Sequence, residues 1–159
     1  MSDQSKLISA KMSPDELAKA CADEMWRNDS ASRGLGMEIV EIASGKAVLR
    51  MKVRKDMTNG HDICHGGFMF LLADSAFAFA CNGYNQITVA QHCSIDFLKP
   101  AYEGEILVAT AQERQKSGRS GIYDVTVKRE IGDIVAEFRG NSRTIKGQHL
   151  PESTNETTN

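Results

Sequence analysis

The stretch that decides the fold is GGFMFLLADSAFAFAC, residues 66–81. From Phe68 to Cys81 every residue is apolar or small except Asp74 and Ser75, and no glycine or proline interrupts the run. This composition predicts a helix that is apolar on nearly all sides, and such a helix is buried. The run is shorter than the ~20 apolar residues of a membrane span, which favours a protein core or interface. We therefore expect the rest of the chain to fold around this helix.

Asp74 lies in the middle of this apolar helix and needs an explanation. An unpaired carboxylate is costly to move out of water, and the residues one helical turn away are apolar, which leaves only the hydroxyl of Ser75 beside it. Distant backbone N–H groups could satisfy a buried aspartate in a purely structural role. The alternative is that Asp74 is kept for chemistry.

Two glycines at the start of the helix, Gly66 and Gly67, favour the chemical interpretation. The first N–H groups of a helix lack intrahelical acceptors, and glycine leaves them uncovered at the positive end of the dipole, which suits a developing oxyanion. At ~1.5 Å per residue, Asp74 lies roughly 10 to 12 Å along the axis from these glycines, too far to share one reacting carbonyl. If they share a site, we expect a symmetric homodimer in which each subunit contributes one of the two groups.

Length and composition suit one domain of ordinary globular character. The chain has 159 residues, and its formal net charge of -2 with a pI near 6.1 gives no electrostatic reason to expect a nucleic-acid partner. No secretory signal or membrane span is evident, so no membrane association and a cytoplasmic location are expected. The four cysteines match neither a zinc knuckle nor a disulfide framework, and we expect them to be reduced.

Secondary-structure patterns place the central helix within a largely β domain. Ser13 and Pro14 favour a first helix over residues 14–28. Alternating apolar and polar residues predict strands over 35–42, 46–53, 87–97, 106–112, 122–131 and 134–145. On the third strand this alternation places Val89 on the buried face with Cys93, and His92 on the opposite, solvated or interface side.

Six mostly antiparallel strands can bury one long helix only by curling around it, which predicts an α+β fold. The expected organisation is an N-terminal segment with a short helix (1–33), one main domain (34–146) and a polar, disordered tail (147–159). The segments 29–34 and 116–121 are expected to be a turn-rich link and a polar hairpin loop.

Four motifs together identify a family. They are NGH at 59–61, HGG at 65–67, ADSAFA at 73–78 and SIDFLKP at 94–100. In combination they resemble the hotdog-fold acyl-CoA thioesterases, and within them the phenylacetic-acid-degradation (PaaI-type) family. The resemblance implies a sheet wrapped around one helix, a dimer with a continuous sheet and usually a homotetramer. It also implies hydrolysis of phenylacetyl-CoA and its ring-hydroxylated forms, with no cofactor, since CoA is part of the substrate.

The resemblance also implies roles for individual residues. Asp74 resembles the catalytic carboxylate, Gly66 supplies the N–H that polarises the thioester carbonyl, and Asn59 and His65 surround the attacking water or thioester. We add Gly67 as a second oxyanion donor. Asp74 acts either as a nucleophile or through water as a general base, with hydrogen-bond donors expected to keep it ionised. Further substrate contacts are predicted at Ser75, Phe68, Lys116 and Arg119, the last two for the CoA phosphates.

Three competing interpretations stay open. His61 and His65 are four residues apart, as in helical zinc proteases, but Gly66 and Gly67 follow where that helix would have to continue, so no metal site is expected. A hotdog hydratase or dehydratase would need a histidine beside its carboxylate, and the central helix has none. A non-catalytic acyl-CoA-binding module would retain ligand affinity without Asp74.

Overall fold

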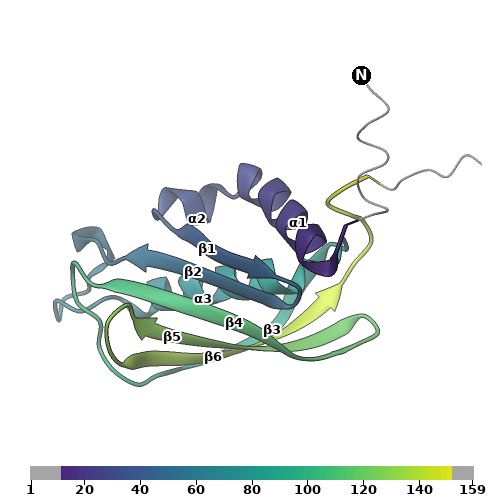
Figure 1. Cartoon of the computed structure of the whole chain (residues 1–159). Helices are drawn as coiled ribbons and strands as arrows, with labels where there is room; N and C mark the ends of the chain where they lie inside the picture. The colour runs from purple at the N-terminus through teal and green to yellow at the C-terminus, as the bar shows by residue number, and fades with distance from the viewer. Residues whose placement is uncertain (1–11, 152–159) are drawn as a thin grey trace, which may run out of the picture.

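The computed structural model describes residues 12–151 and shows a six-stranded antiparallel sheet that curves around one long helix (Figure 1). The strand order is β1-β2-β4-β5-β6-β3, so β1 and β3 form the two edges. The strands are β1 (Glu38–Ala43), β2 (Lys46–Lys52), β3 (Thr88–Phe97), β4 (Ile106–Ser117), β5 (Ser120–Arg129) and β6 (Ile134–Thr144). The helices are α1 (Pro14–Asn28), α2 (Ser30–Gly34), the short 3-10 helix η2 (Lys55–Met57) and α3 (Gly66–Cys81). The predicted α+β fold is confirmed.

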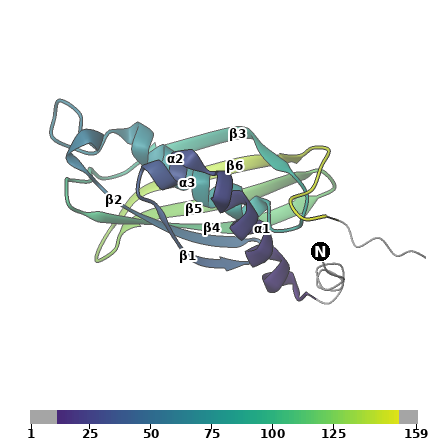
Figure 2. The same cartoon turned by 90° about the horizontal axis from the view of Figure 1, so that it is seen from above.

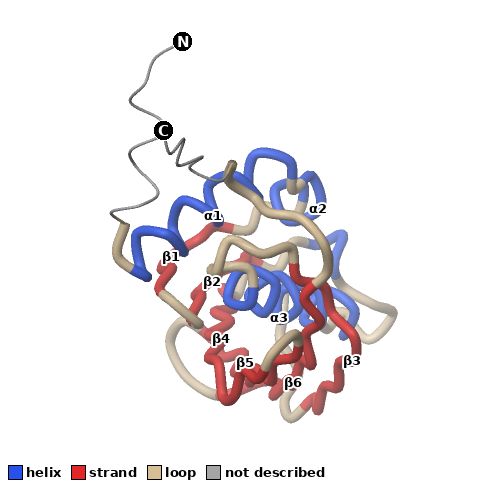
Figure 3. Tube along the Cα trace, turned by 90° about the vertical axis from the view of Figure 1, so that its right-hand side faces the viewer, coloured by secondary structure: helices blue, strands red, loops and turns tan. Residues whose placement is uncertain are grey.

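The helix α3 is buried as its composition predicts, because small and branched side chains on the sheet leave room for it. Seen end-on, the strands curve around α3 (Figure 3). Leu72, Ala73, Ala76 and Phe77 of α3 are buried against the sheet. At Gly140 of β6, an added Cβ would lie 2.8 Å from the Phe77 ring, so glycine at this position lets the strand approach the helix. The buried sheet residues facing α3 include Ala47, Leu49, Ala109, Ala111, Val125 and Val127.

Two helices cover the other side of α3. The predicted N-terminus of α1 is confirmed and carries a capping box, in which Ser13 accepts from the N–H of Glu16 and Glu16 accepts from the N–H of Ser13. Trp26 of α1 packs on Phe79 of α3 with ring centroids 6.0 Å apart, which places α1 across the helix as Figure 2 shows. No helix within residues 12–151 is long and apolar enough to cross a membrane.

Three sequence predictions need correction. The link over residues 29–34 contains the helix α2, because Asp29 caps it by accepting from the N–H of Ser32 at 2.9 Å. The hairpin loop predicted at 116–121 is tighter, since β4 runs to Ser117 and β5 starts at Ser120. The tail is ordered over residues 147–151, because Asn85 Oδ1 accepts from the N–H groups of His149 and Leu150. Residues 152–159 lie outside the described part of the chain.

The edge strand β3 also departs from the predicted alternation. Ala90 pairs with Ser142 and His92 with Asn141, so Gln91 is an extra residue that forms a bulge. The bulge reverses the faces: Val89 is exposed, whereas Cys93 and Ile95, beyond the bulge, pack against the core. The prediction that Val89 shares the buried face with Cys93 is therefore wrong. His92 is exposed, as predicted.

Candidate active site

The first N–H group of α3, that of Gly66, is uncommitted within the described residues. His65 caps the helix: its Nδ1 accepts from the N–H of Gly67 at 2.9 Å, and its carbonyl accepts from the N–H of Phe68 at 3.0 Å. The N–H of Gly66 has no acceptor within residues 12–151. Because His65 already occupies the Gly67 N–H, Gly67 is not available as the second oxyanion donor that the sequence suggests. Of the two glycines, only Gly66 fits that role here.

Backbone hydrogen bonds fix this helix end in place. The N–H of Cys64 bonds the carbonyl of Ala101 at 2.7 Å, and the N–H of His65 bonds the carbonyl of Met57 at 2.8 Å. Asn59 shapes the preceding loop, because its Oδ1 accepts from the N–H of His61 at 2.9 Å. The Gly66 N–H is thus held rigidly, as a preorganised oxyanion donor must be.

A mainly apolar hollow of about 520 Å³ opens beside Gly66. It is bordered by the loop before α3, by the first turn of α3 and by the segment in which β3 ends. The structure thus brings Gly66 and Asn59 together, as predicted, and adds residues that the sequence analysis did not single out for the site. The SIDFLKP motif was the signal for those that follow β3. The lining residues are Asn59, Ile63, Cys64, Gly66, Met69, Phe97, Leu98, Lys99 and Pro100.

Asp74 does not line this hollow. It is half-buried in α3, about 12 Å further along the axis from Gly66 at ~1.5 Å per residue. Its Oδ1 lies 3.9 Å from Sγ of Cys93, and no other hydrogen-bond partner of its side chain is found within residues 12–151. One described chain therefore holds the donor and the carboxylate at separate places.

Burial raises the pKa of Asp74, and the thiol of Cys93 offsets this only in part. The pKa of Cys93 is itself raised to about 11, by burial and by the negative charge of Asp74. Cys93 is therefore a neutral thiol at physiological pH and a weak S–H donor. The set of strong donors that the sequence analysis expects around Asp74 is absent from the described residues of a single chain.

Two residues predicted to contact substrate, Ser75 and Phe68, have partners within the chain. The hydroxyl of Ser75 lies 2.9 Å from the hydroxyl of the buried Ser32, which ties α3 to α2. Phe68 is partly buried against the core, and its ring meets the edge of the His65 ring with centroids 6.3 Å apart. Neither residue lines the hollow beside Gly66.

Lys116 and Arg119 lie at the opposite end of the molecule from Gly66. Lys116 Nζ sits 4.9 Å from the centroid of the Tyr84 ring, just beyond α3, and Arg119 Nε donates to the carbonyl of Thr144 at 3.1 Å. Thr144 pairs with Thr88 at the start of β3, roughly 30 Å from the end of this strand at ~3.3 Å per residue. Within one chain these cations cannot serve a substrate bound at Gly66.

The two histidines of the zinc-protease pattern do not share a helix. His61 is an exposed loop residue, and α3 begins only after His65, as the glycines predict. The helical face on which such a motif presents both rings to a metal is therefore not formed.

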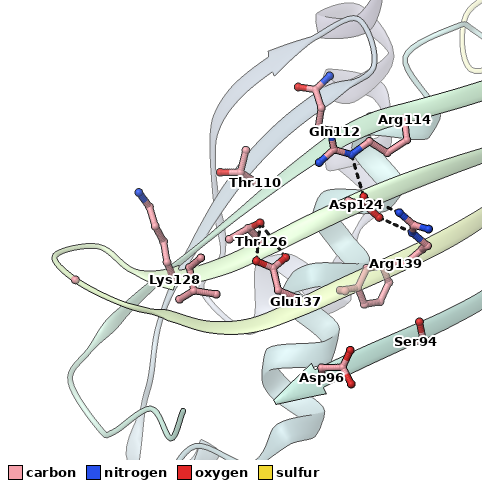
Figure 4. Close-up of a pocket in the computed structure, with 13 residues that line it drawn as sticks. Ser94, Asp96, Thr110, Gln112, Arg114, Asp124, Thr126, Lys128, Glu137 and Arg139 are labelled. Atoms are coloured by element: carbon pink, nitrogen blue, oxygen red, sulfur yellow. Dashed lines mark hydrogen bonds and ion pairs between the residues drawn. The ribbon is translucent and has the colours of Figure 1, made fainter. Parts of the chain in front are cut away.

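A larger hollow of about 790 Å³ lies on the outer face of the sheet (Figure 4). Its centre is an ion-pair cluster in which Asp124 accepts from Arg114 and from Arg139, at 2.9 and 2.6 Å. These pairs hold the pKa of Asp124 below its usual range. None of the predicted site residues lines this hollow, so it is a place distinct from the candidate active site.

Comparisons with known proteins agree with this arrangement. The sequence profile of the Thioesterase superfamily matches residues 61–136. The chain is 44% identical to the acyl-coenzyme A thioesterase PaaI of Escherichia coli (strain K12), over 79% of this chain and 90% of that protein. It is 31% identical to human acyl-coenzyme A thioesterase 13, over 72% of this chain and 85% of that protein.

Solved structures give the same result. The E. coli PaaI protein from the phenylacetic acid degradation operon superimposes with a TM-score of 0.84 at 43% identity, over 86% of this chain and 99% of that one. The TT0310 protein of Thermus thermophilus gives 0.71 at 38% identity, over 74% and 99%. The chain therefore has the hotdog fold and belongs, within the thioesterase superfamily, to the PaaI-type acyl-CoA thioesterases, a family of thioester hydrolases.

Proposed function

We propose that the protein hydrolyses arylacetyl-CoA thioesters, with phenylacetyl-CoA and its ring-hydroxylated forms as substrates, to the free acid and CoA. The observation that carries the proposal is the uncommitted N–H of Gly66, which borders a mainly apolar hollow of about 520 Å³. The similarity to E. coli PaaI, a protein from the phenylacetic acid degradation operon, supports the choice of acyl group.

In the proposed mechanism the thioester oxygen accepts a hydrogen bond from the Gly66 N–H, which stabilises the negative charge that develops on it. Asp74 of the partner subunit either removes a proton from water, which then attacks the carbonyl carbon, or attacks directly to give an acyl anhydride that water hydrolyses. In both routes the C–S bond breaks and CoA leaves as a thiolate. Both routes require Asp74 in its ionised form, and burial of its side chain within one chain raises its pKa.

The proposed assembly is a homodimer with a continuous sheet, and two dimers form a homotetramer. The separation of Gly66 and Asp74 along α3 supports a dimer, because an antiparallel pair of helices brings the donor of one subunit to the carboxylate of the other. The edge position of β3, which pairs only with β6 within the described chain, leaves backbone groups for a partner strand.

The test is CoA release from a panel of aryl- and alkyl-CoA thioesters, measured with a thiol reagent. Release should be fastest with arylacetyl-CoA and should fall by a large factor in Asp74→Asn. The matched control is Asp96→Asn, which removes an exposed carboxylate of β3 and should leave turnover unchanged. Acyl-CoA binding without release by the wild-type protein would overturn the proposal in favour of a binding module.

A further inference from the structure

We infer that the ring of Phe97 is the surface that selects aromatic acyl groups beside the Gly66 N–H. The inference rests on the proposed function and deepens it, since it names the side chain that distinguishes an aryl from an alkyl thioester. It follows from three features: the contact of the ring with Gly66, its exposure to the hollow, and the lack of another aromatic side chain among the described residues that line that hollow.

The Phe97 ring lies directly on Gly66. A Cβ added to Gly66 would be 2.8 Å from Cζ of Phe97 and 3.1 Å from Cε1. These separations are shorter than van der Waals contact, so any larger residue at position 66 must push the ring aside. Glycine at this position therefore has two effects. It leaves the N–H uncovered, and it leaves room for the Phe97 ring.

The ring is also open to the hollow. Phe97 is 52% exposed although it follows Cys93 and Ile95 on the face of β3 that points toward α3. With one side on Gly66, the ring borders the hollow on its free side. An aryl group whose carbonyl is bound at Gly66 can then stack on Phe97, whereas an alkyl chain gains contact area without the ring–ring interaction.

The backbone that carries Phe97 is fixed. Phe97 pairs with Ala136, and the N–H groups of Leu98 and Lys99 both donate to the carbonyl of Val135, at 2.8 and 3.2 Å. Only the side-chain torsions of Phe97 are free to respond to a change at Gly66. The position of the Phe97 ring at the edge of the hollow therefore depends on the residue at position 66.

Other side chains near the site do not offer the same surface. The Phe68 ring contacts His65 and the core and does not line the hollow. The remaining lining side chains are aliphatic, sulfur-containing or polar, and Lys99 is paired with Asp133 at 2.8 Å. Among the described lining residues, Phe97 alone can stack on an aryl ring.

The experiment compares kcat/KM for phenylacetyl-CoA and hexanoyl-CoA in the wild type, Phe97→Leu and Phe97→Tyr. The aryl-to-alkyl ratio should fall about 2- to 10-fold in Phe97→Leu, the range expected from loss of an aromatic pair, and should be retained in Phe97→Tyr. The matched control is Tyr102→Leu, an exposed aromatic residue that does not line the hollow, and its ratio should be unchanged. Equal losses for both thioesters in Phe97→Leu would overturn the inference alone. A wild type that releases CoA from neither thioester would overturn the proposed function as well.

A double-mutant comparison tests the contact with Gly66. Gly66→Ala keeps the N–H but displaces the Phe97 ring, so it should lower the aryl-to-alkyl ratio as Phe97→Leu does. In the Phe97→Leu background, Gly66→Ala should lower the ratio no further, because there is no ring left to displace. Two independent, additive falls would show that Gly66 does not act through Phe97 and would overturn that part of the inference.

Discussion

The role of the Gly66 N–H can be tested by removing that single donor while the helix stays intact. Proline at position 66 lacks an N–H, and the first position of a helix is where proline is best tolerated. The local geometry accepts it: His65, the preceding residue, has φ -60° and ψ 132°, in the extended region that a residue before proline prefers. No hydrogen bond of the described chain is lost, because the Gly66 N–H has no acceptor within it.

The matched control for Gly66→Pro is Gly66→Ala. Both variants place a Cβ against the Phe97 ring, but only alanine retains the N–H. Loss of one oxyanion donor typically lowers kcat by about 10²- to 10³-fold, which corresponds to about 2.7 to 4 kcal/mol. We therefore expect kcat for phenylacetyl-CoA to be about 10²- to 10³-fold lower in Gly66→Pro than in Gly66→Ala.

The assay is steady-state CoA release, with circular dichroism and thermal melting to show that both variants fold. If Gly66→Pro and Gly66→Ala have equal kcat values in folded protein, the N–H of Gly66 does not stabilise the transition state. The oxyanion would then have to be bound elsewhere, and the reasoning from the helix terminus would be refuted.

Three further predictions concern assembly, pH and packing. Mixing Asp74→Asn and Gly66→Pro subunits after dissociation should restore about one quarter of wild-type activity, because half of the dimers are mixed and each mixed dimer regains one of its two sites. Activity no higher than that of the two unmixed variants would contradict a shared site. In Cys93→Val the acid limb of the kcat/KM profile should move to higher pH, because the thiol stabilises the ionised carboxylate of Asp74 and its loss raises the pKa of Asp74 further. Cys93→Ser retains a hydrogen-bond donor and should stay closer to the wild type. Superimposable profiles would show that Cys93 does not influence the pKa of Asp74. Gly140→Ala should lower the free energy of unfolding by about 1 to 3 kcal/mol, because the alanine Cβ would lie 2.8 Å from three atoms of the buried Phe77 ring. Denaturant melts should show that adding Phe77→Leu to Gly140→Ala partly relieves this loss.

The raised pKa of Asp74 also has a consequence for stability. A carboxyl group that holds its proton more tightly in the folded state than in the unfolded state makes folding less favourable as pH rises through the interval between the two pKa values. Above that interval the folded chain carries the full cost of the buried charge. A half-buried, weakly partnered aspartate is therefore poor for stability, which is what a residue kept for chemistry would show.

The sequence predicts the parts of the fold that depend on composition over many residues. The apolar run of α3, the capping signals of α1 and the alternating strands all required only local patterns, and the curvature of the sheet followed from the need to bury α3. The helix α2 was missed because its cap, Asp29, is equally typical of a turn. Residues 147–151 were missed because side chains more than sixty positions earlier, in the loop after α3, hold them.

The residues of the candidate site were predictable from the sequence, but the contacts that they make were not. HGG identifies the helix terminus, yet nothing in those letters shows that the His65 ring turns back to occupy the Gly67 N–H and leaves Gly66 free. The positions of the basic residues were not predictable for a different reason. Lys116 and Arg119 were predicted from their charge alone. Their distance from Gly66 depends on the end of the sheet at which the β4–β5 hairpin lies, which the sequence does not show.

The edge strand β3 contacts both of the proposed catalytic groups, which lie far apart along α3. Its inward-facing residues beyond the bulge include Cys93, which meets Asp74, and Phe97, which covers Gly66. Because the side chains of a strand alternate, a slip of one residue would turn both outward and bring their polar neighbours against α3. The bulge at Gln91 sets the register from which both contacts follow. Sequence alternation could not reveal the extra residue, Gln91. This residue positions Cys93 beside the Asp74 carboxylate and Phe97 beside Gly66, the proposed oxyanion donor.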